Sequence, residues 1–168
     1  MKTRLLLALV VAAIGFAVPA LAQEKAATPA VPNPFQSIPA GPALVQQLEV
    51  IDQKFDEAFN KHDASSVAAF YTANAIQATP VGVFSGREAI EKYFTELFQR
   101  FNPSDRSTKL GYVYVFGGDL CAIGVCTVII NGPHPPPHQA GWYLVNVYTP
   151  VRDTWKISAA VFKYATGP

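Results

Sequence analysis

This sequence has almost no excess of basic over acidic residues, and it has few cysteines. Its 168 residues include 13 Lys or Arg against 12 Asp or Glu, which gives a formal net charge of +1, and no block of basic residues occurs. A protein that binds nucleic acid or an anionic membrane surface usually carries a basic patch. The composition therefore supports neither partner, and the length is that of one domain.

Long apolar runs are also missing, except at the N-terminus. There Lys2 and Arg4 precede LLLALVVAAIGFAV, and Ala20-Leu21-Ala22 has the small residues of a cleavage site. The run is shorter than the ~20 residues of a bilayer crossing, which disfavours a membrane anchor. We predict a signal peptide over residues 1–22, cleaved after Ala22, and a periplasmic or secreted mature chain. Removal of the signal peptide takes away two positive charges and leaves the mature chain with a formal charge of −1.

Only two cysteines occur, Cys121 and Cys126, both within LCAIGVCTVII. This apolar run predicts one β-strand, along which five residues span about 16 Å and an odd offset places side chains on opposite faces. A disulfide needs Cα atoms within about 7 Å. We expect two buried free thiols, unless a tight turn at Ile123-Gly124 brings the two side chains together.

The rest of the chain changes character twice. Residues 23–41 are rich in Ala and Pro without an apolar period, which predicts an unfolded tether. A helical period then begins, and its apolar stripe comprises Leu44, Leu48, Ile51, Phe55, Ala58 and Phe59. Asp63 is the expected N-cap of a short helix over 64–71, and residues 76–79 suggest a short strand.

A third helix follows this strand. Ser85 and Glu88 have the S-x-x-E spacing of a capping box, and Asn102-Pro103 ends the helix. Its apolar face comprises Ile90, Tyr93, Phe94, Leu97, Phe98 and Phe101. After Pro103 the period becomes two, which predicts strands over 109–116, 120–130, 141–149 and 154–162. Helices first and antiparallel hairpins after them indicate the α+β class.

The order of these elements and several short motifs resemble the SnoaL-like group of the nuclear transport factor 2-like superfamily. The similarity extends over about residues 43–164 within a domain at 42–165. Its motifs are Asn60 and Asp63, Phe70-Tyr71-x-x-Asn74-Ala75, Gly86-Arg87-Glu88-Ala89-Ile90 and Trp155-Lys156-Ile157. The resemblance implies a cone-shaped, curved antiparallel sheet wrapped around three N-terminal helices, a pocket open at one end, and a homodimer formed through the outer sheet face.

The resemblance does not fix an activity, because this group includes isomerases, dehydratases, cyclases, epoxide hydrolases and pockets without a known reaction. Its steroid isomerases use an Asp base, a Tyr donor and a second acid. These positions fall on Thr79, Phe55 and Asn146 here. A Thr hydroxyl is a poor base and Phe cannot donate a hydrogen bond, so this isomerase mechanism is not expected.

Few other side chains are candidates for chemistry. Asp52 lies at the flank of the first helical stripe and could reach the pocket mouth. His134 and His138 form H-P-P-P-H, in which three prolines prevent the helix that would let both rings bind zinc. We expect no metal or cofactor, and we expect these histidines in a stiff loop, where one of them could border the pocket mouth.

The remaining inward residues predict an aromatic pocket that suits a small, mostly apolar molecule. If Asn146 faces inward, strand alternation places residues 142, 144 and 148 inward as well. The candidate lining is Phe55, Phe59, Thr79, Tyr93, Trp142, Leu144, Asn146 and Tyr148. Three functions stay open: a ligand-binding domain, an enzyme of lyase, isomerase or hydrolase type with an unidentified acid–base group, and a protein-interaction domain with a filled cone.

Overall fold

The computed structural model describes residues 37–132 and 137–165; the predicted signal peptide, most of the predicted tether and His134 lie outside this part. Within it, three helices accompany seven strands. In chain order they are β1 (Ile38–Pro39), α1 (Pro42–Asn60), α2 (Ala64–Ala68), β2 (Tyr71–Thr79), β3 (Gly82–Ser85), α3 (Arg87–Phe101), β4 (Ser104–Phe116), β5 (Asp119–Ile130), β6 (His138–Val151) and β7 (Thr154–Tyr164).

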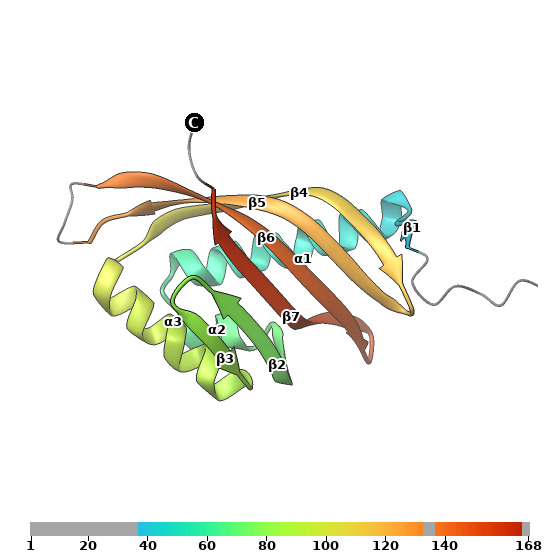
Figure 1. Ribbon diagram of the computed structural model, residues 1–168, viewed down its shortest axis with the longest axis horizontal. Helices are drawn as coiled ribbons and strands as arrows, with labels where there is room; N and C mark the ends of the chain where they lie inside the picture. The colour runs from blue at the N-terminus through green and yellow to red at the C-terminus, as the bar shows by residue number, and fades with distance from the viewer. Residues whose placement is uncertain (1–36, 133–136, 166–168) are drawn as a thin grey trace, which may run out of the picture. The chain divides into compact units, whose positions relative to one another are not determined.

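All seven strands form one curved sheet in the order β1-β4-β5-β6-β7-β2-β3 (Figure 1). The long strands β4 to β7 pair as consecutive antiparallel hairpins, as predicted. The pair β2–β7 is parallel, so the sheet is mixed and not purely antiparallel. These two strands come from distant parts of the chain, and no hairpin forces them to be antiparallel. The α+β class is confirmed.

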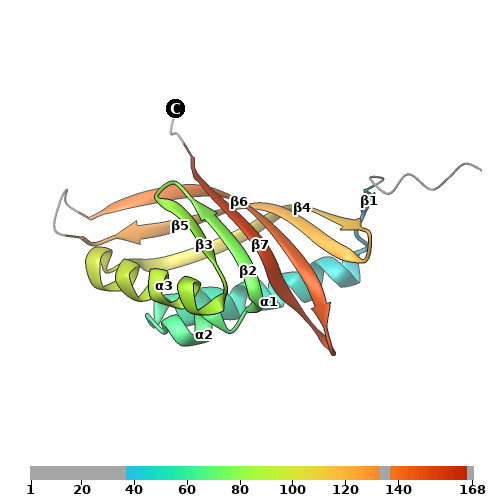
Figure 2. The same cartoon turned by 60° about the horizontal axis from the view of Figure 1, so that its bottom comes forward.

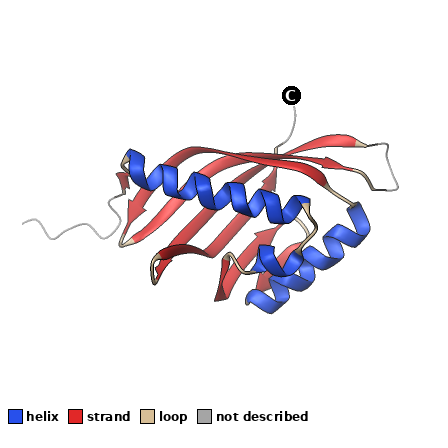
Figure 3. Ribbon diagram, turned by 180° about the vertical axis from the view of Figure 1, so that it is seen from behind, coloured by secondary structure: helices blue, strands red, loops and turns tan. Residues whose placement is uncertain are grey.

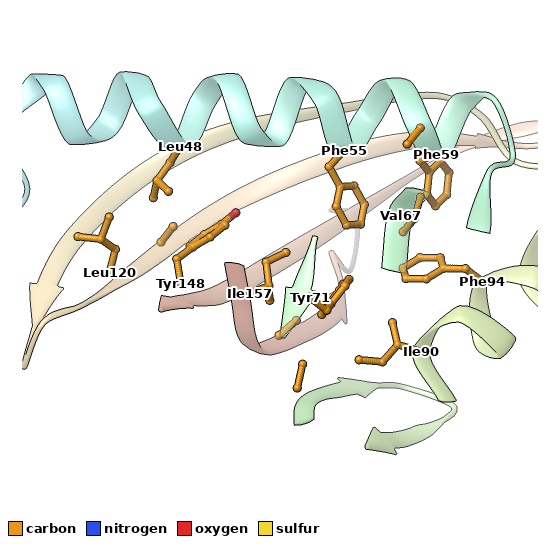
Figure 4. Close-up of a cluster of buried hydrophobic side chains, with 14 of the residues drawn as sticks. Leu48, Phe55, Phe59, Val67, Tyr71, Ile90, Phe94, Leu120, Tyr148 and Ile157 are labelled. Atoms are coloured by element: carbon orange, nitrogen blue, oxygen red, sulfur yellow. The ribbon is translucent and has the colours of Figure 1, made fainter. Parts of the chain in front are cut away.

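The helices lie on one face of this sheet. Helix α1 runs across the strands, while α2 and α3 gather at one end (Figure 3), and the β2–β3 hairpin lies beside α3 (Figure 2). The apolar stripe of α1 packs against the sheet, as its period predicted. Figure 4 shows that Leu48, Phe55 and Phe59 of α1 point toward side chains of the sheet and of α3. Those of the sheet include Tyr71, Tyr148 and Ile157, and Phe94 belongs to α3.

Three local predictions need correction. The capping box does not form, because Ser85 pairs with Ile76 in the β2–β3 hairpin and Gly86, at φ 86°, is the N-cap. The second helix ends at Ala68, since Tyr71 already starts β2. Part of the predicted tether is ordered: Ile38–Pro39 pair with β4 as strand β1.

The cysteines follow the prediction of free thiols. Neither forms a disulfide; Cys126 is buried and Cys121 is half-buried. The alternating burial along β5 places Cys126 on the helix side of the sheet and Cys121 on the outer side. In the described part of the chain, no helix is both long and apolar enough to cross a membrane.

Candidate functional site

Aromatic side chains surround a small cavity between the helices and the sheet. Its volume is about 60 Å³, room for roughly four water molecules or for the inner end of a larger molecule. The rings of Phe55 and Phe94, which both line it, meet edge-on with their centroids 6.0 Å apart. We call this space the inner cavity; its lining comprises Phe55, Phe59, Gln77, Tyr93, Phe94, Leu97, Pro103, Arg106, Cys126, Val128, Ile130, Trp142 and Phe162.

A wider groove of about 490 Å³ adjoins the inner cavity, and Tyr93, Leu97, Ile130 and Trp142 line both. We call it the outer groove. The ring of Trp142 packs on that of Tyr164 at 4.2 Å and forms part of its wall. Its other lining residues are Pro80, Val81, Phe84, Glu96, Arg100, Phe101, His138 and Ala140. Together the two spaces reach the size of pockets that bury small molecules.

Gln77 brings a side-chain amide to the inner cavity. It faces inward from β2, is 1% exposed, and its Oε1 atom has no hydrogen-bond partner among the described residues. An unsatisfied buried acceptor costs about 1–3 kcal/mol. The cavity therefore contains an acceptor that a bound molecule could satisfy.

Arg106 brings a charge to the cavity wall, and Asp56 of α1 balances it. The two side chains form a buried ion pair, and the guanidinium lies 4.6 Å from the centroid of the Phe55 ring. Asn60 fixes the backbone of Arg106 from both sides, because its Oδ1 accepts from Arg106 N at 2.7 Å and its Nδ2 donates to Arg106 O at 3.0 Å. Asn60, which forms one of the sequence motifs together with Asp63, thus positions the backbone of Arg106.

A chain of buried hydrogen bonds lies farther along the sheet. Asn146 Nδ2 donates to the Tyr148 hydroxyl at 3.2 Å, and that hydroxyl donates to Asp52 Oδ1 at 2.6 Å. Burial raises the pKa of Asp52, as does Glu49, although the Tyr148 bond and Arg106 act in the opposite direction. Burial also raises the pKa of Tyr148, as do the charge and the hydrogen bond of Asp52. None of these three residues lines the inner cavity.

Asp52→Asn should remove part of the pH dependence of stability. Because folding raises the pKa of Asp52 above its ordinary 3.8, the unfolded chain loses this proton first as the pH rises. Stability therefore falls between pH 3.8 and the raised pKa, by about 1.4 kcal/mol for each pH unit between the two values. Asp52→Asn should lack this loss, so its free energy of unfolding should increase relative to the wild type as the pH rises.

Urea denaturation of both proteins between about pH 4 and pH 7 measures this difference. Asp153→Asn is the matched control, because Asp153 is exposed in the β6–β7 turn and the same charge is removed there. An Asp52→Asn variant whose stability follows the wild-type pH profile throughout would contradict a raised pKa of Asp52 in the folded protein.

The structure brings together half of the predicted lining. Phe55, Phe59, Tyr93 and Trp142 all border the inner cavity. Leu144 is fully buried in packing and does not border it, and Asn146 and Tyr148 are occupied by the hydrogen-bond chain. Thr79 binds the backbone of its own turn through Gly82 O at 3.1 Å, and it also contacts the Tyr93 hydroxyl.

Of the two predicted pocket-mouth residues that the structure describes, one borders the outer groove and the other does not. Asp52 of α1 is 6% exposed and points toward the sheet, not to the mouth, because the Tyr148 hydroxyl holds it inward. His138 begins β6 and lines the outer groove. Among the described residues, no group of three His, Cys, Asp or Glu side chains could hold a metal ion.

Nine of the thirteen lining residues were not predicted from the sequence, among them the polar residues Gln77 and Arg106. Gln77 lies two positions before Thr79, and strand alternation from Thr79 could have placed it inward. Arg106 precedes the predicted start of its strand at 109, and no local pattern marks it as buried. Its partners in α1 lie about 50 positions earlier in the chain, so only the fold reveals the site.

Comparison with known proteins agrees with this architecture. A family model for the SnoaL-like domain matches residues 53–156, more than half of the chain. A comparison with the curated proteins finds no match.

Solved structures are similar in fold at low sequence identity. A ketosteroid isomerase-like protein from Erwinia carotovora atroseptica has a TM-score of 0.65 at 12% identity, covering 76% of this chain and 100% of that one. Aln2 from a Streptomyces species has a TM-score of 0.66 at 17% identity, with 76% and 94% covered. A nuclear transport factor 2-like superfamily protein from Salmonella enterica serovar Typhimurium has a TM-score of 0.62 at 14% identity, with 74% and 94% covered.

The family model, the element order and the curved sheet over three helices all agree. The chain belongs to the SnoaL-like domain family, and its fold is similar to that of a nuclear transport factor 2-like protein.

Proposed function

We propose that this protein binds a small, mostly apolar molecule whose inner end lies in the inner cavity and whose body extends into the outer groove. The supporting observation is the continuity of the two spaces, which share four lining residues. Aromatic and aliphatic walls with few polar groups are typical of sites for such molecules. Since the family includes isomerases and dehydratases, the fold alone assigns no reaction.

Binding is favoured over acid–base catalysis by the chemistry of the lining. Among the described residues, no carboxylate and no histidine line the inner cavity; its ionisable groups are Tyr93, Arg106 and Cys126. Burial raises the pKa of Tyr93 to about 12 and also raises that of Cys126. Neither group ionises readily near neutral pH, and general acid–base catalysis works best with a pKa near the working pH.

Two variants of the same strand test the proposal. Val128 of β5 lines the inner cavity, whereas Val125 of β5 is exposed on the outer face. Val128→Phe should fill the cavity, and Val125→Phe adds the same bulk outside it. In an NMR titration with p-cresol, the wild type and Val125→Phe should show saturable shifts that Val128→Phe lacks. Absence of binding to the wild type, or unchanged binding to a folded Val128→Phe, would reject the proposal.

We also propose that a second copy of the chain covers the outer sheet face. One row of cross-strand partners there is apolar across six strands; it comprises Tyr112, Ile123, Val145, Val161, Ala78 and Val83. Tyr112 is 65% exposed and Val161 is 49% exposed. Contiguous exposed apolar patches are typical of protein–protein contacts, and the same row on a second copy offers a self-complementary surface.

The double variant Ile123→Lys/Val161→Lys should be monomeric while the wild type is dimeric, as measured by light scattering after size exclusion. Asp153→Lys, a charge change at the β6–β7 turn, should remain dimeric. A wild type that is monomeric at high concentration would reject the homodimer.

We also propose that the protein acts in the periplasm or outside the cell, because the sequence predicts a signal peptide over residues 1–22. Mass spectrometry of the protein recovered from its host should find a mature N-terminus at Gln23. Recovery of only the uncleaved chain would reject export by this route.

A further inference from the structure

We infer that the molecule in the inner cavity is electrically neutral and donates a hydrogen bond to Gln77 through a hydroxyl or N–H group. This inference rests on the proposed function and narrows it to a chemical class. The candidates are phenols, alcohols and N–H heterocycles with an otherwise apolar body.

The position of Gln77 favours a ligand that donates a hydrogen bond. It pairs with Phe84 of β3 and Ala160 of β7, so its backbone is fixed in the interior of the sheet. Its neighbour Ile76 points outward and is exposed, while the Gln77 side chain is buried on the cavity side. The Oε1 atom is inaccessible to solvent and has no partner among the described residues. A donor on the ligand would satisfy it after a turn of the Gln77 side chain toward the cavity, without any rearrangement of the strand.

Water is the alternative hydrogen-bond partner for Gln77 Oε1, and the cavity walls suit it less well than a ligand. A buried water usually makes about three hydrogen bonds to polar groups. Apart from Gln77, the lining offers four polar side-chain groups: the Arg106 guanidinium, the Cys126 thiol, the Tyr93 hydroxyl and the Trp142 indole N–H, amid aromatic and aliphatic walls. The Arg106 guanidinium is paired with Asp56, and the Tyr93 hydroxyl contacts Thr79. A ligand that joins one donor to an apolar body fits these walls better than a cluster of waters does.

The charges in the cavity wall favour a neutral ligand. The side chains of Arg106 and Asp56 are 7% and 13% exposed, and their charges compensate each other. Thr108 completes the coordination of Asp56 through its backbone N–H at 2.6 Å and its hydroxyl at 2.9 Å. An anionic ligand would have to compete with Asp56, and a cationic ligand would face Arg106. Burying an unpaired charge is costly, so a neutral molecule is favoured.

Three ligands of nearly equal size test this inference: p-cresol, p-xylene and p-toluate. They present a hydroxyl, a methyl group and a carboxylate on the same tolyl body. The wild type should bind p-cresol at least about ten-fold more tightly than p-xylene, and p-toluate least tightly. In Gln77→Leu the preference for p-cresol over p-xylene should disappear or invert. Dissociation constants from NMR titration decide each comparison.

The outcomes separate this inference from the proposed function. Equal binding of p-cresol and p-xylene to the wild type would overturn the hydrogen bond to Gln77 and leave the apolar site intact. Tighter binding of p-toluate would overturn the neutral class. Failure of all three to bind would overturn the proposed function itself. If Gln77→Leu does not fold, Gln77→Met, which keeps the side-chain length, replaces it, and the wild-type ligand series still decides.

Discussion

Arg106→Leu should lower the free energy of unfolding by about 3–5 kcal/mol, because it leaves a buried carboxylate without its partner. Asp56 is enclosed between α1 and β4, where it pairs with Arg106 and accepts two hydrogen bonds from Thr108. The substitution also removes the guanidinium from the rings of Phe55 and Phe59, an interaction worth up to about 2 kcal/mol when desolvated.

Urea denaturation with linear extrapolation measures this loss. The double variant Asp56→Leu/Arg106→Leu should recover much of it, because replacing a whole buried pair by apolar residues is often close to neutral. Lys92→Ala is the control for an exposed pair, since Lys92 and Glu96 are both largely in solvent; it should cost less than about 0.5 kcal/mol. A loss below about 1 kcal/mol for Arg106→Leu would contradict a buried, mutually dependent pair.

Gly124→Ala should destabilise the protein by about 3 kcal/mol, at the upper end of the usual cost of overpacking. A Cβ atom at Gly124 would lie 2.5 Å from the backbone oxygen of Lys109 and 3.2 Å from Leu110 Cα. The obstacle is backbone, which cannot rotate away as a flexible side chain can. The register of β4 against β5 shifts between Leu110 and Tyr112, and this irregularity brings the β4 backbone close to Gly124.

Gly41→Ala is the matched control, because a Cβ at Gly41 would meet no atom within 4 Å and its φ of −67° suits any residue. It should change the free energy of unfolding by less than about 0.5 kcal/mol. Thermal and urea unfolding of both variants provide the comparison. A Gly124→Ala protein as stable as the wild type would show that β4 and β5 approach each other less closely than described.

The sequence predicted the fold wherever a period extends over several turns or strand pairs. The apolar stripe from Leu44 to Phe59 became α1, and the four period-two runs became β4 to β7. Short motifs were less reliable, because tertiary contacts override them. The S-x-x-E spacing failed because pairing with β2 keeps Ser85 extended and leaves the turn into α3 to Gly86. Asp63, in contrast, caps α2 as expected, with Ser66 N at 2.9 Å from Oδ1.

The site was less predictable than the fold for a physical reason. Alternation along a strand says which side chains face inward, but not which of them pack against a helix and which border a cavity. Leu144 and Trp142 face the same side of β6, yet only Trp142 borders the cavity. Buried polar partners add a second difficulty, since Asp52 and Tyr148 are 96 positions apart. The cavity depends on such long-range pairs, which no local pattern contains.

A crystal structure of the protein purified from its own host tests the binding claim most directly. Our account predicts electron density for a small molecule in the inner cavity, with a donor atom within hydrogen-bond distance of Gln77 Oε1. A structure in which the side chains of Phe55, Phe94 and Trp142 close over this space and leave no room for a ligand would contradict it.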